Sequence, residues 1–257
     1  MTNSTSDADP WWIDFYGDLL NDVLLEQTSM VELVRTESFF LTALGIAEGS
    51  RVFDQCCGNG RLSHYLAPLG VDIVGIDLAQ GYIDLANQRT SEGMRCQFEA
   101  ADAFTYVVDP PCDAAFNWWT SFGYTASDAK NLEMLQRAFE SLRTGGRFAL
   151  DFMNVPGVLR HFQPSVITRA PSKDGEITLL RESRLDLGKG VLHKRWTYYQ
   201  NDTQKAEFDS QVRLYDPPKL VELFVAAGFT DIEVYGDLDQ SSIQLDSPRC
   251  IVTATRP

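Results

Sequence analysis

The sequence predicts a doubly wound α/β fold, in which helices cover both faces of a mostly parallel sheet. Three observations lead to this prediction. Short apolar runs alternate with helical patterns between residues 51 and 152, a glycine-rich turn follows the first run, and two more apolar runs close the chain. Parallel strands appear as nearly continuous apolar runs because both of their faces are buried. Together these runs predict a seven-stranded sheet.

The elements of this sheet follow one another in order. Apolar residues at three-to-four spacing predict two leading helices over 11–27 and 29–44, the second ended by Gly45. We then expect strands and helices to alternate over 51–54, 61–69, 71–77, 79–89, 96–102, 112–119, 128–142 and 146–152. Each strand is short and apolar, and each helix begins near a turn residue.

The pattern changes after the fifth strand. Apolar and polar residues alternate over 177–187, 191–200 and 206–215, which predicts antiparallel hairpins. The residues Asp216-Pro217-Pro218 then open a helix over 219–227 that Gly228 ends, and strands over 231–235 and 249–255 complete the sheet. We therefore expect N-terminal helices over 1–48 and a core over 49–257, which an antiparallel insertion interrupts at about 154–215.

Composition narrows the range of partners. The chain has 257 residues with 36 Asp plus Glu against 22 Lys plus Arg, a formal net charge of −14. Such a surface repels phosphate backbones, so we expect no nucleic-acid partner. No apolar run is long enough to span a membrane, and residues 1–10 lack the pattern of a signal peptide. Five cysteines without a C-x-x-C pair indicate a reducing, cytoplasmic setting and no metal site. We expect a monomer or a homodimer.

The turn after the first strand reads Asp54-Gln55-Cys56-Cys57-Gly58-Asn59-Gly60. Its small residues allow the backbone to approach a ligand closely. Dinucleotide-binding turns carry a third glycine where this chain has Ser63, and the Asp54 carboxylate would repel a pyrophosphate. The turn therefore favours a ligand that bears an ammonium or sulfonium group. An NAD(P)-dependent oxidoreductase on the same core is the alternative.

The segments RVFDQCCGNGRLS and VGIDLAQGYIDLA resemble class I S-adenosylmethionine-dependent methyltransferases, over about 51–152. The insertion and the segment RLYDPPKLVELFVAAGF resemble a bacterial small-molecule branch of that family. The family usually has glycine where this chain has Cys56, and a positive φ at that position would cost energy. The resemblance implies a Rossmann-like fold and S-adenosyl-L-methionine as cofactor, with S-adenosyl-L-homocysteine as product. It implies methyl transfer to nitrogen or oxygen, less readily carbon, of a small-molecule acceptor. A binding module without catalysis is a further alternative.

The cofactor candidates lie at the ends of the first four strands. Asp77 ends the second strand, where a carboxylate can accept hydrogen bonds from ribose hydroxyls. Asp102 either meets the adenine amino group, as the resemblance implies, or caps the next segment. The complete cofactor set that we predict is Asp54, Cys56, Gly58, Gly60, Asp77, Leu78, Asp102, Ala103 and Asn117.

Aromatic and basic side chains supply the candidates for the acceptor side. In-line methyl transfer needs a water-poor pocket that aligns the reacting atoms. The resemblance makes the first helix a lid over the cofactor, although its aromatic residues could instead pack the core. We predict His161, Tyr124 and Tyr16 as catalytic, with His161 the first candidate base. The predicted substrate-binding residues, each of which could instead be an ordinary core or strand residue, are Trp12, Trp119, Arg181, His193, Arg213 and Tyr215.

Overall fold

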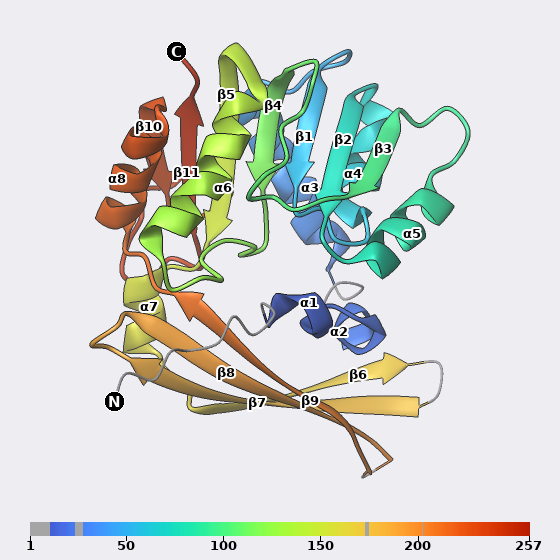
Figure 1. The fold of residues 1–257 in the computed structure, drawn as a ribbon, viewed down its shortest axis with the longest axis vertical. Coiled ribbons are helices and arrows are strands. Elements are labelled where there is room, and N and C mark those ends of the chain that lie inside the picture. The colour runs from blue at the N-terminus through green and yellow to red at the C-terminus, as the bar shows by residue number, and fades with distance from the viewer. Residues whose placement is uncertain (1–10, 24–27, 173–174, 202) are drawn as a thin grey trace, which may run out of the picture.

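The computed structural model describes residues 11–23, 28–172, 175–201 and 203–257. A large sheet flanked by helices lies above a smaller twisted sheet, and two short helices lie between them (Figure 1). The predicted N-terminal region is thus described only in part, because residues 1–10 and 24–27 lie outside these ranges.

The large sheet has seven strands in the order β10-β11-β5-β4-β1-β2-β3. Strands β1 to β5 pair in parallel, whereas β11 runs antiparallel to both of its neighbours, β10 and β5. The strands are β1 (Arg51–Gln55), β2 (Asp72–Asp77), β3 (Cys96–Ala100), β4 (Cys112–Asn117), β5 (Leu142–Phe152), β10 (Thr230–Tyr235) and β11 (Cys250–Thr255). The predicted doubly wound, mostly parallel sheet of seven strands is confirmed.

Helices bury both faces of this sheet. Adjacent β1 residues belong to different core clusters: Phe53 packs with residues of α6 and α8, whereas Val52 packs with residues of α3 and α4. This alternation follows from the period of two in a strand. The helical elements are α3 (Met30–Phe39), the π-helical turn η2 (Phe40–Leu44), α4 (Arg61–Leu66), the 3₁₀ turn η3 (Ala67–Leu69), α5 (Gln80–Arg89), α6 (Asp128–Glu140) and α8 (Pro217–Ala227).

The smaller sheet is the antiparallel insertion that was predicted after the fifth strand. Helix α7 (Val155–Arg160) leads into it from β5, and its strand order is β6-β7-β8-β9. Its strands are β6 (Ser165–Ser172), β7 (Gly175–Asp186), β8 (Val191–Gln200) and β9 (Thr203–Arg213). The sequence pattern indicated only the last three. Strand β6 is absent from the prediction because it is an edge strand with a proline and with half of its residues exposed, features that weaken the apolar signal.

The leading segment forms two short helices, α1 (Trp12–Phe15) and α2 (Asp18–Val23), rather than one helix over 11–27. The helical path is broken at Tyr16, whose backbone is extended with φ −88° and ψ 98°. The carbonyl of Gly17, which follows the break, accepts hydrogen bonds from the Tyr82 hydroxyl at 3.0 Å and from the Asn21 N–H. The helix break at Tyr16 thus lies beside a hydrogen bond to α5. The apolar periodicity of the sequence does not reveal this break. Across the described ranges, every helix is too short or too polar to cross a bilayer.

Candidate active site

A first cavity of about 120 Å³ lies at the carboxyl ends of β1, β2 and β3. Parallel sheets of this kind bind ligands at that edge. The backbone turns sharply there, since φ is +67° at Cys56, +55° at Gly58 and +73° at Gly60. Glycine adopts this conformation freely, whereas Cys56 holds it at a cost of about 1 kcal/mol. Six of the nine predicted cofactor residues line this cavity, namely Cys56, Gly58, Asp77, Leu78, Asp102 and Ala103.

The carboxylate of Asp77 ties the second strand to the glycine turn. One oxygen accepts the Gly58 N–H at 2.9 Å and the other accepts the Ala79 N–H at 3.0 Å. Burial raises the pKa of this carboxyl, and these backbone donors oppose the rise. Each carboxylate oxygen has a second lone pair, so Asp77 can still accept two hydroxyl donors.

The other three predicted cofactor residues lie behind the cavity wall. Asp54 is buried, accepts a hydrogen bond from the Ser63 hydroxyl at 2.6 Å, and has a pKa raised to about 7. Desolvation causes this rise; the Ser63 hydrogen bond opposes it, and repulsion from Asp77 adds to it. Gly60 caps the start of α4. Asn117 is fully buried, and its side-chain amide donates to Gln55 Oε1 at 3.2 Å. Its side-chain oxygen, Oδ1, lacks a hydrogen-bond partner.

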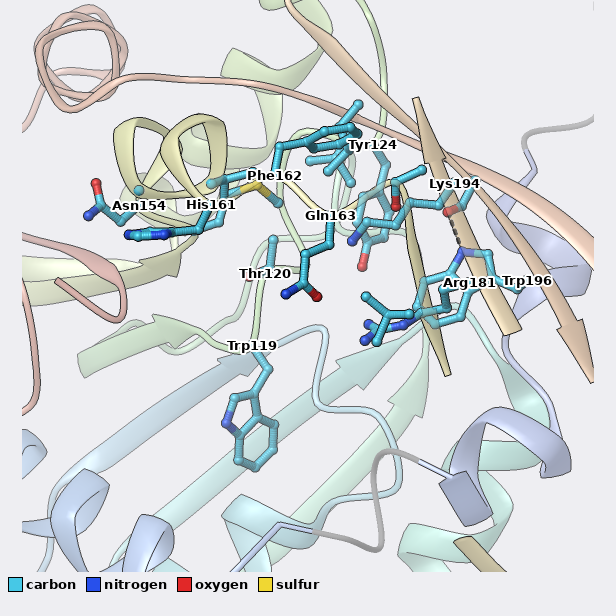
Figure 2. Close-up of a pocket in the computed structure, with 18 of the residues that line it drawn as sticks. Trp119, Thr120, Tyr124, Asn154, His161, Phe162, Gln163, Arg181, Lys194 and Trp196 are labelled. Atoms are coloured by element: carbon cyan, nitrogen blue, oxygen red, sulfur yellow. Dashed lines mark hydrogen bonds between the residues drawn. The ribbon is translucent and has the colours of Figure 1, made fainter. Parts of the chain in front are cut away.

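A second and larger cavity, of about 640 Å³, lies between the edge of the large sheet, α7 and the inner face of the insertion (Figure 2). Its volume is within the range of small-molecule binding sites. Residues from the N-terminal helices, the segment after β4, α7 and strands β7 to β9 line it. Three side chains, Tyr16, Trp119 and Tyr124, line both cavities and so form the wall between them. We call these three residues the dividing wall.

Two predicted catalytic residues of the dividing wall are hydrogen-bonded to each other. The hydroxyls of Tyr16 and Tyr124 share a short hydrogen bond, and the Trp11 indole donates to the Tyr124 carbonyl at 3.3 Å. Burial raises the pKa of both tyrosines, and at Tyr16 the neighbouring Tyr124 adds to the rise. Both hydroxyls are therefore protonated at neutral pH and act as hydrogen-bonding groups rather than as bases.

The third wall residue, Trp119, is held by a strained loop after β4. Trp119 and Thr120 have φ of +56° and +62°, which residues other than glycine adopt only when neighbouring structure enforces it. The enforcing group is Asp151, at the end of β5: its side chain accepts the Trp119 N–H at 3.2 Å, and its carbonyl accepts the Thr120 N–H at 3.2 Å. Arg249 pairs with the same carboxylate at 3.3 Å. Burial raises the Asp151 pKa to about 6, and Arg249 opposes that rise.

The remaining predicted catalytic and substrate residues are scattered. His161 lines the larger cavity, but it is exposed and its Nε2 is 2.9 Å from Asp246. Arg181 lines that cavity from β7. Trp12 lines the smaller cavity instead. His193 lines neither cavity, because side chains alternate along β8 and it faces away from its neighbour Lys194.

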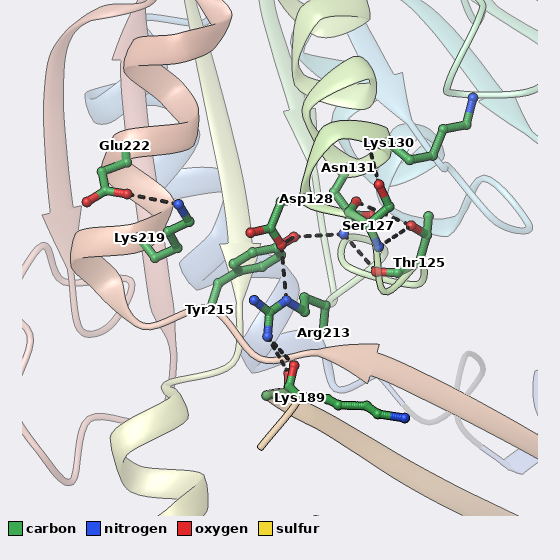
Figure 3. Close-up of polar contacts among 11 residues, drawn as sticks. Thr125, Ser127, Asp128, Lys130, Asn131, Lys189, Arg213, Tyr215, Lys219 and Glu222 are labelled. Atoms are coloured by element: carbon green, nitrogen blue, oxygen red, sulfur yellow. Dashed lines mark hydrogen bonds and ion pairs between the residues drawn. The ribbon is translucent and has the colours of Figure 1, made fainter. Parts of the chain in front are cut away.

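Arg213 and Tyr215 also lie outside both cavities and connect the end of β9 to α6 (Figure 3). Arg213 Nε is 3.0 Å from an Asp128 oxygen, and the Tyr215 hydroxyl donates to the same oxygen at 2.9 Å. The Asn131 amide donates to the Tyr215 hydroxyl at 2.8 Å. Their polar groups are thus engaged within the protein.

Lys194 and Trp196 of β8 are among the residues that line the larger cavity and that the sequence did not predict. Burial, with repulsion from Arg181, lowers the pKa of Lys194 to about 8. Alternation along β8 places the two on one face, but it cannot tell which face lines a cavity. That choice depends on how the insertion packs against α1 and α2.

The smaller cavity has the chemistry for S-adenosylmethionine. Asp77 lines the cavity and Asp54 lies buried behind its wall, and a cationic ligand would stabilise the charged forms of both carboxyls. Trp12, Leu78 and Phe104 offer apolar surface to a planar ring. Within the described part of the chain, no three His, Cys, Asp or Glu side chains converge as a metal site requires.

Comparisons with known proteins agree with this geometry. Residues 52–146 match a family described as "Methyltransferase domain". A Geobacillus sp. (strain WCH70) protein, provisionally named a methyltransferase, is 22% identical over 84% of this chain and 88% of its own length.

Two solved structures share the fold across nearly the whole chain. The CcbJ methyltransferase of Streptomyces caelestis superposes with a TM-score of 0.77 at 19% identity, over 93% of this chain and 97% of its own. The S-adenosylmethionine-bound amino pentose methyltransferase CalS10 of Micromonospora echinaspora gives a TM-score of 0.68 at 18% identity, over 95% and 99%. The match to a methyltransferase domain, rather than the shared fold, sets aside the oxidoreductase alternative. Residues 52–146 thus form a methyltransferase domain, and the chain as a whole has the fold of S-adenosylmethionine-dependent methyltransferases.

Proposed function

We propose that this enzyme transfers the methyl group of S-adenosylmethionine to an amine nitrogen of a small-molecule acceptor, with S-adenosylhomocysteine as the second product. The observation that carries the proposal is the dividing wall. Tyr16, Trp119 and Tyr124 line both cavities, so a donor in the smaller cavity and an acceptor in the larger one meet at the same three side chains. Bringing two reactants to one such boundary is a large part of catalysis by this chemistry.

The ionisation state of the wall favours nitrogen over a hydroxyl oxygen. Both wall tyrosines have raised pKa values and hold their protons. His161, the predicted base, is paired with Asp246 at an exposed edge of the larger cavity. An alcohol needs a base in the transition state, whereas an amine can lose its proton before the reaction and then attack directly. The amino pentose methyltransferase among the structural neighbours acts on an acceptor of this general kind.

The size of the larger cavity supports a small acceptor. A volume of about 640 Å³ accommodates a molecule of the size of a sugar or a drug. The N-terminal helices line it on one side and the insertion on the other, which favours a compact acceptor over an extended polymer. All five cysteines are free thiols, three of them buried, which supports a reducing cytoplasmic setting.

The test uses pairs of acceptors that differ only in an amine or a hydroxyl at the same position. The enzyme is incubated with methyl-labelled S-adenosylmethionine and each member of a pair, and the labelled product is identified by mass spectrometry. We expect label on the amine member. Label on the hydroxyl member alone would overturn the nitrogen assignment. The enzyme is also incubated with an extract of small molecules from the source cells. If it binds the cofactor tightly but methylates no acceptor in either experiment, a binding module would be favoured instead.

A further inference from the structure

The inner face of the insertion carries a pair of cationic side chains that the proposed reaction does not use. In the register of β7 and β8, Arg181 is opposite Trp196, and Ser183 is opposite Lys194. Residues directly opposite one another in an antiparallel pair share a face, and all four line the larger cavity. Figure 2 shows Arg181, Lys194 and Trp196 together on neighbouring strands.

Both cations lie against one aromatic ring. The Arg181 guanidinium carbon is 5.4 Å from the centre of the Trp196 ring, and the Lys194 ammonium is 5.7 Å from it. Trp196 is itself fixed, because its indole N–H donates to the Ser210 hydroxyl at 2.7 Å. The two positive groups are thereby held over a common, rigid platform.

Neither cation has a carboxylate partner among the residues that the structure describes. The Arg181 Nε is buried without a hydrogen-bond partner. The one carboxylate among the cavity residues, Asp246, is already paired with Arg160 and His161. By contrast, Arg195 on the outer face of the same sheet pairs with Asp209 at 3.1 Å and Glu207 at 3.8 Å.

This arrangement is costly in the absence of a ligand. Burial lowers the pKa of Arg181, and burial together with Arg181 lowers that of Lys194. Two half-buried like charges without a counter-ion destabilise the folded protein. The chain has 36 Asp plus Glu and a net charge of −14, yet none of the described carboxylates is placed beside these two cations. A bound anion would relieve both the desolvation and the repulsion.

We infer that Arg181 and Lys194 form an oxyanion subsite, which binds a carboxylate or phosphate group of the acceptor and directs its amine toward the dividing wall. The planar guanidinium suits two parallel hydrogen bonds to such a group, and the ammonium adds a second charge. The inference rests on the proposed function for its role in turnover. Anion binding itself can be measured without turnover.

The direct test is the reactivity of Lys194 toward an amine-acylating reagent, followed by mass spectrometry of the peptides. The full-length enzyme is labelled at about pH 8, without cofactor, in rising concentrations of inorganic phosphate or of acetate. We expect at least one of the two anions to slow Lys194 labelling severalfold, while the exposed Lys205 of β9 is unaffected. The anion that protects identifies the group as phosphate or carboxylate. Equal labelling of Lys194 at all concentrations of both would overturn the subsite.

Variants extend the test to catalysis. Arg181→Gln should abolish the protection, and it should raise the KM of an anionic amine acceptor by about tenfold or more while leaving that of a neutral analogue unchanged. Arg195→Gln, on the outer face, is the matched control and should change neither. If an anion protects Lys194 but no acceptor is methylated, the subsite is supported and only the methyl-transfer proposal is contradicted. An equal rise in KM for anionic and neutral acceptors would contradict the subsite.

Discussion

Cofactor affinity should depend on pH through the buried carboxyl of Asp54. Its pKa of about 7 means that the carboxyl is half protonated near neutral pH in the absence of a ligand. A cationic ligand needs the ionised form. Lowering the pH from about 7.5 to about 5.5 should therefore weaken S-adenosylmethionine binding by about twentyfold, since below the pKa each pH unit costs a factor of ten.

Isothermal titration calorimetry at several pH values measures this effect, and buffers of different ionisation enthalpy count the protons released. Asp54→Asn should bind more weakly at neutral pH and lose most of the pH dependence. Ser63→Ala removes the hydrogen bond that lowers the Asp54 pKa, so its affinity should begin to fall at a higher pH. Asp84→Asn, an exposed change on α5, is the control. Wild-type affinity that is flat between pH 5.5 and 7.5, with no proton release, would refute the reasoning.

The same carboxyl makes an independent prediction about stability. Its folded-state pKa is above its ordinary value of 3.8, so the folded protein holds the proton more tightly than the unfolded chain. The free energy of unfolding should therefore fall as pH rises from about 4 to about 7. Asp54→Asn removes this penalty and should stabilise the ligand-free protein at about pH 8 by about 1–4 kcal/mol. Denaturant melts test this, and a destabilised variant would show that the Asp54 carboxylate stabilises the folded protein.

Three further predictions concern the walls of the two cavities. Tyr16→Phe and Tyr124→Phe should each slow single-turnover methyl transfer by about tenfold. Because each hydroxyl is the other's hydrogen-bond partner, the double variant should lose much less rate than the product of the two single effects. Effects that multiply would contradict the pairing. The Phe15 ring packs against Trp196 and joins α1 to the insertion. Phe15→Ala should therefore speed amide hydrogen exchange in α1 and α2 but not in the large sheet. Unchanged exchange in α1 would contradict this. Arg213→Gln should lower stability by about 1 kcal/mol in a denaturant melt without changing acceptor KM; a large rise in KM would restore its predicted substrate role.

The strands and the cofactor turn were accessible from sequence because they depend on local signals. Asp77 and Asp102 follow apolar runs, and parallel strands bring their carboxyl ends to one edge whatever the rest of the chain does. The strain suspected at Cys56 is present, with φ at +67°. Such residues are identified by their position at the end of an element.

The acceptor side was less accessible because it depends on tertiary register. His193 and Lys194 are neighbours, and only the packing of the insertion against α1 and α2 decides which one lines the cavity. Arg213 and Tyr215 are engaged by Asp128, which is more than 80 residues away in the chain. The break at Tyr16 leaves the apolar periodicity intact and was invisible for that reason.

The central claim is that donor and acceptor meet at the dividing wall. A crystal structure of the enzyme with S-adenosylhomocysteine tests this claim directly, since the thioether sulfur marks where the methyl group departs. We predict that the sulfur contacts Tyr16, Trp119 or Tyr124 and faces the larger cavity beyond them. A sulfur atom that is turned toward solvent, or separated from that cavity by other side chains, would contradict the account.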